Sequence, residues 1–304
     1  MIAILDFGTN TFNLLIAERK ERSFEILHAS KQPVKLGRGG IQINRITPDA
    51  FERGFIAIHN HLETIKKFKV EEIRAFATSA IRNASNGNQF VDEVEKRFGI
   101  RVRVIPGDRE AELIYKGVRQ AVTITDRKVM ILDIGGGSNE FIICNREGII
   151  WKHSFELGMA RILELFDISD PISHEEIQAL ESYFRHELQP LFEVVGKERP
   201  QIMIGASGSF DTFYAILRHR TGIVADVGHG REIAMQDFRK IHRLLIRSTI
   251  AERKVMPGME PVRVEMVVPA VIFVSFVMRE CQIKHLVQSE FALKEGVISE
   301  LVGL

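Results

Sequence analysis

The sequence predicts an α/β protein built from two duplicated domains that face each other across a cleft. The first observation is an internal repeat, because Ile2–Arg19 and Val129–Arg146 each indicate a strand, a tight glycine-containing turn and a second strand. Asp6 falls on Asp133 at a constant offset of 127 residues (133 − 6). A repeat this distant indicates two similar halves rather than a solenoid, whose periods are shorter. The second observation is length, since 304 residues are enough for two cores.

The first half alternates strand and helix patterns. Thr47 and Pro48 are expected to begin a helix that runs to about Phe68, as N-cap and first helical residue. We expect His59 and His61 of this helix at the surface or rim. The other predicted elements are a strand at Phe24–Ser30, a strand at Glu72–Ala77, a helix at Asn88–Phe98, a strand at Arg101–Ile105 and a helix that Asp108 caps and that ends near Ala121.

The second half repeats this layout. Ser173 is expected to begin a long helix over Pro171–Leu191. The other predicted elements are strands at Ile149–Glu156, Gln201–Ile204 and His285–Gln288, and helices at Met235–Arg247, Arg263–Arg279 and Lys294–Val302. We expect the last helix to return to the first half. Domain I then comprises residues 1–121 with 289–304, and domain II comprises residues 122–288.

Composition restricts the class of partner. The chain has 41 Lys and Arg against 40 Asp and Glu, so its formal net charge of +1 creates no global field for a nucleic-acid polymer or an acidic membrane. The longest apolar run, Met266–Met278, is too short to span a bilayer. The run Ile2–Leu5 stops at Asp6, which does not fit a signal peptide. With Cys144 and Cys281 taken as buried thiols, we expect a cytoplasmic protein. A homodimer is among the assemblies that the sequence leaves open.

The second copy of the repeat contains the densest group of candidate site residues. Gly135, Gly136 and Gly137 allow backbone N–H groups to approach an anion, and Ser138 adds a hydroxyl donor. Asp133 and Glu140 could hold a hard divalent cation through oxygen. A hairpin turn with a solvated aspartate would explain one such stretch. The repeat disfavours that explanation, because Thr11 keeps the hydroxyl of Ser138 in the first copy.

Other candidates have two explanations each. Arg82 follows a strand in a Thr-Ser turn, where it could hold a phosphate or pair with an acid. Glu110 lies in the first turn of a predicted helix, and the helix dipole alone would favour an acidic residue there. The alternative is that Glu110 faces the cleft and takes a proton from an attacking water. Lys31, Lys35 and Arg38 fit a solvated loop, which is the usual explanation, or a polyanion path.

Several motifs occur in an order that resembles one family. They are DFGTNTFNLLI at 6–16, VKLGRG at 34–39, ATSAIRNASN at 77–86, IPGDREAELIYKGV at 105–118, DIGGGSNEF at 133–141, LGMAR at 157–161, GASGSFDT at 205–212 and KEG at 294–296. Together they resemble the exopolyphosphatase / guanosine pentaphosphate phosphohydrolase (Ppx/GppA) family, which has the duplicated, ribonuclease H-like fold of actin. The resemblance covers nearly the whole chain.

The resemblance implies hydrolysis of phosphoanhydride bonds with Mg²⁺ in the cleft between the domains. From the residues alone we would favour a structural role for Glu110 at the start of its helix, but the resemblance assigns it as the catalytic carboxylate. The resemblance also assigns Asp133 and Glu140 to the metal. The positions it assigns to phosphate binding are Asn10, Thr11, Arg82, Gly135, Gly136, Gly137, Ser138, Gly208 and Ser209. Candidates for holding the rest of a polyanion are Lys31, Lys35, Arg38 and Lys294.

The expected activity is that of an exopolyphosphatase, in which water attacks the terminal phosphoryl group of inorganic polyphosphate. The nearest alternative is a guanosine pentaphosphate (pppGpp) 5′-phosphohydrolase, which performs the same chemistry on a nucleotide. A kinase or ATPase of the same fold would need an adenosine pocket and a second substrate. A non-catalytic sensor of (p)ppGpp or polyphosphate belongs to another class, and the presence of Glu110, Asp6 and Asp133 argues against it.

Overall fold

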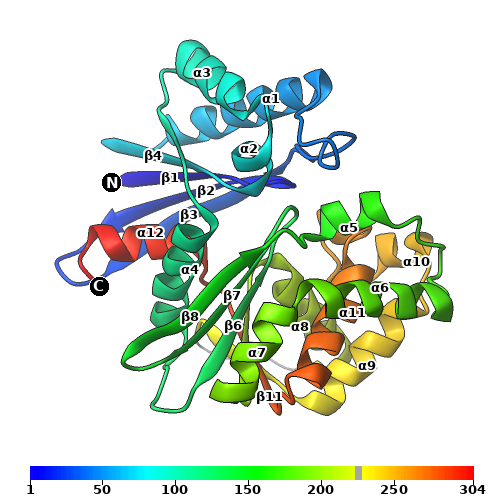
Figure 1. The fold of residues 1–304 in the computed structure, drawn as a ribbon. Helices are drawn as coiled ribbons and strands as arrows, with labels where there is room; N and C mark the ends of the chain where they lie inside the picture. The colour runs from blue at the N-terminus through cyan, green and yellow to red at the C-terminus, as the bar shows by residue number, and fades with distance from the viewer. Residues whose placement is uncertain (223–227) are drawn as a thin grey trace.

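The structure, a computed structural model that describes residues 1–222 and 228–304, has two α/β domains that each contain one mixed sheet (Figure 1). The first sheet has the order β3-β2-β1-β4-β5, with strands Phe24–Pro33, Thr11–Arg19, Ile2–Phe7, Glu72–Ala77 and Val102–Val104. The second has the order β10-β11-β9-β6-β7-β8, with strands Gly230–Ile233, His285–Ser289, Ile202–Ala206, Val129–Ile134, Asn139–Asn145 and Gly148–Phe155. The predicted α/β fold of two duplicated domains is confirmed.

The duplication extends to the register of the strands. β1 pairs antiparallel with β2 and parallel with β4, and β6 pairs in the same two ways with β7 and β9. Asp6 lies opposite Asn13 in the first hairpin, and Asp133 lies opposite Glu140 in the second. Since both members of the pair are displaced by the same offset, the repeat seen in the sequence is a repeat of structure. Each hairpin places an aspartate at the same point of its sheet.

Helices cover the outer face of each sheet. In the first domain these are α1 (Pro48–Ile65), α2 (Ser79–Asn83) and α3 (Gly87–Phe98), and the ring of Phe90 stacks on that of Phe55 and meets that of Phe12 edge-on. In the second domain they are α5 (Met159–Leu165), α6 (His174–Glu187), α7 (Gln189–Glu198), α8 (Gly208–Thr221), α9 (Met235–Ile246), α10 (Ile250–Val255) and α11 (Val267–Glu280). Helix α11 is apolar on almost all sides and is buried against α6 and α9.

Two helices lie between the sheets, namely α4 (Gly107–Ala121) and α12 (Leu293–Leu301). They belong to one apolar cluster with both sheets, in which Ile4 of β1 and Ile131 of β6 are fully buried. Helix α12 therefore returns to the first half, as expected, and it contacts β1 and α4. Helix α4 also packs on β7 and β8 of the second sheet. The domain boundaries at 121/122 and 288/289 remain predictions.

The packing of α4 on α12 predicts the effect of Gly296→Ala. A Cβ atom on Gly296 would lie 1.7 Å from the carbonyl oxygen of Leu113, a backbone atom that cannot rotate away. We expect the two helices to separate, with a loss of about 1–3 kcal/mol in the free energy of unfolding. Thermal unfolding measures the loss.

Gly196→Ala in α7 is the matched control. Among the described residues nothing lies within 4 Å of a Cβ atom built at Gly196, so this change is expected to be neutral or stabilising. Equal unfolding temperatures for Gly296→Ala and Gly196→Ala would contradict the close approach of α4 to α12.

Some expectations about local structure are confirmed and others are wrong. Thr47 caps α1, and Ser173 caps α6 in a capping box with Glu176. The single helix expected at Pro171–Leu191 is wrong. This segment forms two helices that meet at Leu188. A continuous helix would need a backbone N–H at residue 190, which Pro190 lacks. The helix expected from Arg263 begins at Val267, after the short 3₁₀ turn η1 (Pro261–Arg263).

Two further expectations about side chains are wrong. Asp108 does not cap α4, which begins at Gly107 after Pro106, although Glu110 still lies in the first turn. His61 is not at the surface, because it is 1% exposed and its Nε2 lies 3.0 Å from the carbonyl oxygen of Phe12, to which it donates. Burial lowers the pKa of His61, and the hydrogen bond to the carbonyl oxygen of Phe12 opposes this effect. No helix within the described ranges has the length and apolarity needed to cross a membrane.

Candidate active site

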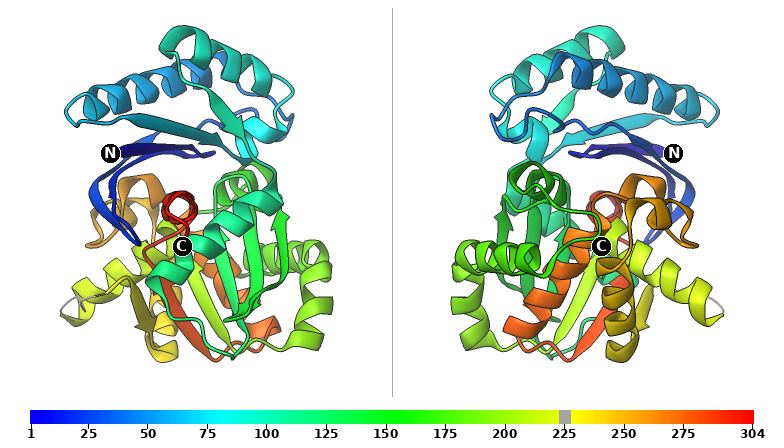
Figure 2. Two further views of the ribbon diagram at one scale, coloured as in Figure 1. Left: turned by 90° about the vertical axis from the view of Figure 1, so that its left-hand side faces the viewer. Right: turned by 90° about the vertical axis from the view of Figure 1, so that its right-hand side faces the viewer.

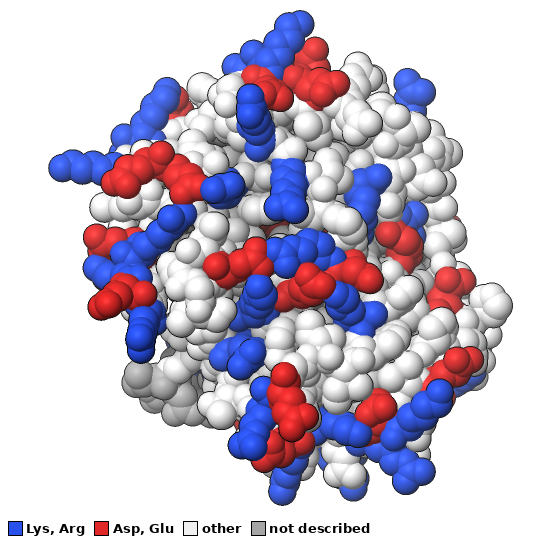
Figure 3. Space-filling view, turned by 60° about the vertical axis from the view of Figure 1, so that its left-hand side comes forward, with Lys and Arg blue, Asp and Glu red and all other residues white. Residues whose placement is uncertain are grey.

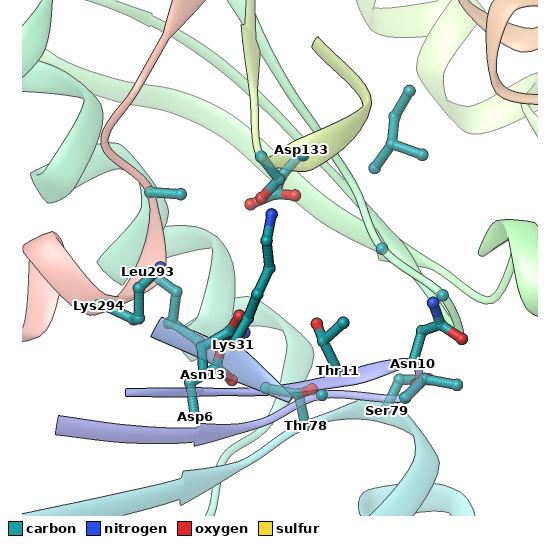
Figure 4. Close-up of a pocket in the computed structure, with 18 of the residues that line it drawn as sticks. Asp6, Asn10, Thr11, Asn13, Lys31, Thr78, Ser79, Asp133, Leu293 and Lys294 are labelled. Atoms are coloured by element: carbon teal, nitrogen blue, oxygen red, sulfur yellow. Dashed lines mark hydrogen bonds between the residues drawn. The ribbon is translucent and has the colours of Figure 1, made fainter. Parts of the chain in front are cut away.

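A pocket of about 280 Å³ lies between the two sheets (Figure 4). It is lined by the tips of both hairpins, the turns before α2 and α8, the end of β3 and the start of α12. Asp133 of the second domain faces Asp6, Thr11 and Thr78 of the first domain across it. Ligands of α/β proteins usually bind at such a place, beyond the carboxyl ends of parallel strands. The two hairpin tips thus meet at one cleft, as the repeat predicts.

The two glycine turns have the same geometry. Gly8 N–H donates to the carbonyl oxygen of Thr11 at 3.1 Å, and Gly135 N–H donates to that of Ser138 at 3.0 Å. Gly137 lies where the domains approach each other, because a Cβ atom there would be 2.5 Å from the Oγ of Ser79. A larger residue at this position would displace the side chains of Ser79 and Thr9. All seven of the predicted residues in these two turns line the pocket or its wall: Asn10, Thr11, Asp133, Gly135, Gly136, Gly137 and Ser138.

A third turn closes the pocket at α8. Gly208, its first residue, lines the pocket, whereas Ser209 is buried behind it. A Cβ atom on Gly208 would lie 2.2 Å from Nη2 of Arg263, so this glycine lets the guanidinium lie over the start of the helix. Ser207 before it has a φ of 70°, the left-handed region that a serine rarely adopts. This turn therefore places a cation and a helix N-terminus at the pocket.

Four carboxyl groups gather in the pocket, and all are nearly inaccessible to solvent: those of Asp6, Glu110, Asp133 and Glu140. Glu140 accepts hydrogen bonds of 2.7 Å from the Oγ atoms of Ser138 and Ser154 on one oxygen. Burial, with the repulsion of Asp133, raises the pKa of Glu140 to about 7. Burial raises the pKa of Asp133 to about 6. Burial therefore favours the protonated form of both carboxyl groups in this pocket.

Among the residues that the structure describes, Glu110 forms one ion pair, with Arg82. Nη1 of Arg82 donates to Oε2 of Glu110 at 2.8 Å and to the carbonyl oxygen of Ile105 at 3.1 Å. The ion-pair explanation of Arg82 therefore describes this structure, and Arg82 lies behind Glu110. Burial and the repulsion of Glu140 raise the pKa of Glu110 well above its ordinary value, and Arg82 opposes them. A pKa raised in this way suits a carboxylate that accepts a proton near neutral pH.

The donor set fits a magnesium ion. Within residues 1–222 and 228–304, no three His, Cys, Asp or Glu side chains form a cage that could hold a metal by themselves. Mg²⁺ usually binds through one or two carboxylates and completes its shell with water and phosphate oxygens. Asp133 and Glu140 are a facing pair of this kind, and their raised pKa values show an environment that a cation would relieve.

The predicted polyanion cations have different surroundings. Lys294 lines the pocket, and Glu295 and Asp6 raise its pKa against the effect of burial. Lys31 also lines the pocket, but its Nζ lies 2.5 Å from both carboxylate oxygens of Glu260. Lys35 pairs with Glu265 at 2.8 Å, and Arg38 is exposed; both lie outside the pocket. Two of the four predicted cations therefore line the pocket.

The sequence did not point to Arg263 or Asp211 as site residues. Both line the pocket, and among the described residues Nε of Arg263 is buried without a hydrogen-bond partner. Arg263 lies in the short turn η1, where no periodic sequence pattern predicts which way a side chain points. Asp211 lies in the first turn of α8, where the helix dipole alone is enough to explain an acidic residue. Asp6 is a different case, because its alignment with Asp133 was a usable signal.

The buried carboxyl groups predict a pH-dependent effect of Mg²⁺ on stability. The pKa of Asp133 is raised from 3.8 to about 6 and that of Glu140 from 4.5 to about 7, so the folded state binds more protons over this range. Their contribution to stability is present below pH 3.8 and is lost as the pH rises through 6 to 7. Each pKa unit corresponds to about 1.4 kcal/mol, so the loss is on the order of a few kcal/mol.

Urea unfolding with Mg²⁺ and with a chelator at pH 5 and pH 8 measures this effect. We expect Mg²⁺ to stabilise the protein much more at pH 8, where the carboxylates are charged. Equal stabilisation at the two pH values would contradict binding at this pair.

The fold and the pocket define a class of protein, namely proteins of two duplicated α/β domains whose shared cleft combines the glycine turns, carboxylates and cations that phosphoryl chemistry uses. The chain belongs to the Ppx/GppA phosphatase family, whose model matches residues 15–304. The resemblance seen in the motifs is therefore confirmed.

Individual relatives match over the whole chain. An exopolyphosphatase from Cytophaga hutchinsonii, known by crystal structure, is 36% identical, with a TM-score of 0.95 over 99% of this chain and 97% of that one. The Mycobacterium tuberculosis protein named Exopolyphosphatase 2 is 27% identical over 99% of this chain and 98% of its own length. The Ppx/GppA enzyme of Aquifex aeolicus is 24% identical, with a TM-score of 0.80 over 98% of both chains, and shows the shared fold.

Proposed function

We propose that this protein is an exopolyphosphatase, which uses water and a divalent cation, Mg²⁺, to release the terminal phosphate of inorganic polyphosphate. The observation that carries the proposal is the position of Glu110, whose carboxyl group lies in the same pocket as the glycine turns and the pair Asp133 and Glu140. The naming of two full-length relatives as exopolyphosphatases supports it.

The residues take the following parts. Backbone N–H groups of the two glycine turns bind the oxygens of the terminal phosphoryl group. Glu110 accepts a proton from the water whose oxygen attacks phosphorus, and the bond to the bridging oxygen breaks, giving orthophosphate and a polymer one unit shorter. Arg82 holds the carboxylate of Glu110 in place. Asp133 and Glu140 would hold Mg²⁺, which supplies positive charge to the phosphate oxygens when it is bound.

A panel of substrates tests the proposal. Phosphate release is measured with Mg²⁺ on polyphosphates of several lengths, on guanosine pentaphosphate and on ATP. We expect the highest kcat/KM on polyphosphate and no release after the metal is chelated. A higher value on guanosine pentaphosphate would assign the chain as a 5′-phosphohydrolase instead. Tight binding of either compound with no metal-dependent release would assign it as a sensor.

A further inference from the structure

Among the described residues, two neighbouring ion pairs join the β3 edge of the first domain to the segment around η1, and one of them lies at the pocket. Lys31, near the end of β3, contacts both oxygens of Glu260, which precedes η1 in the second domain. Lys35 contacts Glu265 at 2.8 Å a few residues further along both segments. Both pairs join parts of the chain more than two hundred residues apart. Figure 2 shows the β3 edge of the first sheet beside the segment that leads into η1.

The two pairs differ in their relation to the pocket. Lys31 lines it and Lys35 does not. The side chain of Lys31 points toward Asp133 from the side of Asn13 (Figure 4). Asn10 and Ser79 lie on the other side, where α2 carries Arg82, the partner of Glu110. Lys31 therefore reaches the pocket from the side away from Asn10 and Ser79, and this is the side on which we expect the phosphates behind the scissile bond to pass.

Charge explains what this pair does to a polyanion. On the face of the molecule shown in Figure 3, acidic and basic side chains are interspersed, so attraction of a polyanion depends on local cations. Glu260 neutralises one of these, and its carboxylate repels phosphate at the same place. The pair is partly exposed, with side-chain accessibilities of 41% and 33%, and such pairs contribute little to stability. A ligand of higher charge can displace the carboxylate.

We propose that Glu260 determines specificity by masking Lys31, so that only a polyphosphate long enough to place phosphates beyond the scissile bond displaces the carboxylate and gains this contact. The inference rests on the proposed function and deepens it. Lys31 is then a contact for the distal part of the substrate. We expect pyrophosphate to end before Lys31, so that it neither meets nor needs this contact. The closed pair excludes short anions from this part of the pocket without affecting the reacting phosphoryl group.

The test is Glu260→Gln, which removes the charge and keeps the size of the side chain. Two unit charges about 4 Å apart in watery surroundings change an equilibrium roughly five-fold, so we expect KM for long-chain polyphosphate to fall by about that factor. The value of kcat should stay within about two-fold of the wild-type value, because Glu260 does not touch the reacting group. KM for pyrophosphate should not change. An unchanged or higher KM for long-chain polyphosphate would overturn the proposal.

Glu265→Gln is the matched control, since it makes the same charge change at the pair outside the pocket. An equal fall in KM from Glu265→Gln would indicate a general field effect and overturn the assignment to Glu260. Lys31→Met separates masking from repulsion. In that background Glu260→Gln should lose most of its gain, and retention of the full gain would show that Glu260 acts by repulsion alone.

A measurement of polyphosphate binding without turnover distinguishes failure of this inference from failure of the proposed function. Calorimetric titration with long-chain polyphosphate in the presence of a chelator measures binding by wild type and by the four variants without turnover. Tighter binding by Glu260→Gln together with no phosphate release by wild type would reject the hydrolase and keep the masked lysine. Phosphate release by wild type with identical binding by wild type and Glu260→Gln would reject the masked lysine and keep the hydrolase.

Discussion

Glu110→Gln is expected to lower kcat for phosphate release by about 10²- to 10⁴-fold, the usual contribution of a general base. The amide keeps the size of the side chain but cannot accept the proton of the attacking water. Arg82 can still donate to the remaining carbonyl oxygen, so the first turn of α4 should keep its position. Polyphosphate binding should therefore survive. Loss of one negative charge from a pocket that holds four buried carboxyl groups should leave binding equal or tighter.

Glu112→Gln provides the comparison for this prediction. Glu112 lies on the same helix, but it pairs with Arg109 and Lys152 outside the pocket. Its replacement should leave kcat near that of wild type. Release of phosphate by Glu110→Gln at the wild-type rate would remove Glu110 from the mechanism, and an equal loss in Glu112→Gln would trace the effect to the helix rather than to the site.

The sequence was most informative where local pattern and packing agree. The hairpin repeat predicted both the duplication and the meeting of Asp6 with Asp133, because a strand fixes where its last residues point once its sheet neighbours are known. The start of α1 was equally clear, since Thr47 and Pro48 act on their own backbone. Features that depend on a few neighbouring residues could be predicted in this way.

The sequence was less informative wherever a partner comes from a distant segment. Arg82 had two explanations because its choice between acid and phosphate depends on Glu110, which a different element supplies. Lys31 lies in a basic segment that fits a polyanion path, but its partner Glu260 lies 229 residues further along the chain, so the sequence did not indicate their ion pair. Arg263 comes from a short irregular turn with no periodicity to orient it. Charge pairing between domains is a property of the tertiary fold, so a list of charged residues does not contain it.

Asp133→Asn is expected to have the other large effect, because it removes one charge of the pair proposed to hold Mg²⁺. Metal ions supply several kcal/mol of transition-state stabilisation, and about 1.4 kcal/mol corresponds to a tenfold change in rate, so kcat should fall by about 10²- to 10⁴-fold. Binding of Mg²⁺ should weaken as well. This second effect separates Asp133 from Glu110, whose replacement leaves the metal pair intact.

The metal dependence of stability checks this without any turnover. The stabilisation by Mg²⁺ at pH 8 should disappear in Asp133→Asn and persist in Glu110→Gln. Asp126→Asn is the control, because Asp126 is exposed, precedes β6 and pairs with Arg146. This variant should behave as wild type in both measurements. Asp133→Asn that keeps the full response to Mg²⁺ would show that the cation binds elsewhere. The paired carboxylates at the tip of the second hairpin would then need another partner, and Lys294, which is half-buried and lines the same pocket, is a cation already placed to serve.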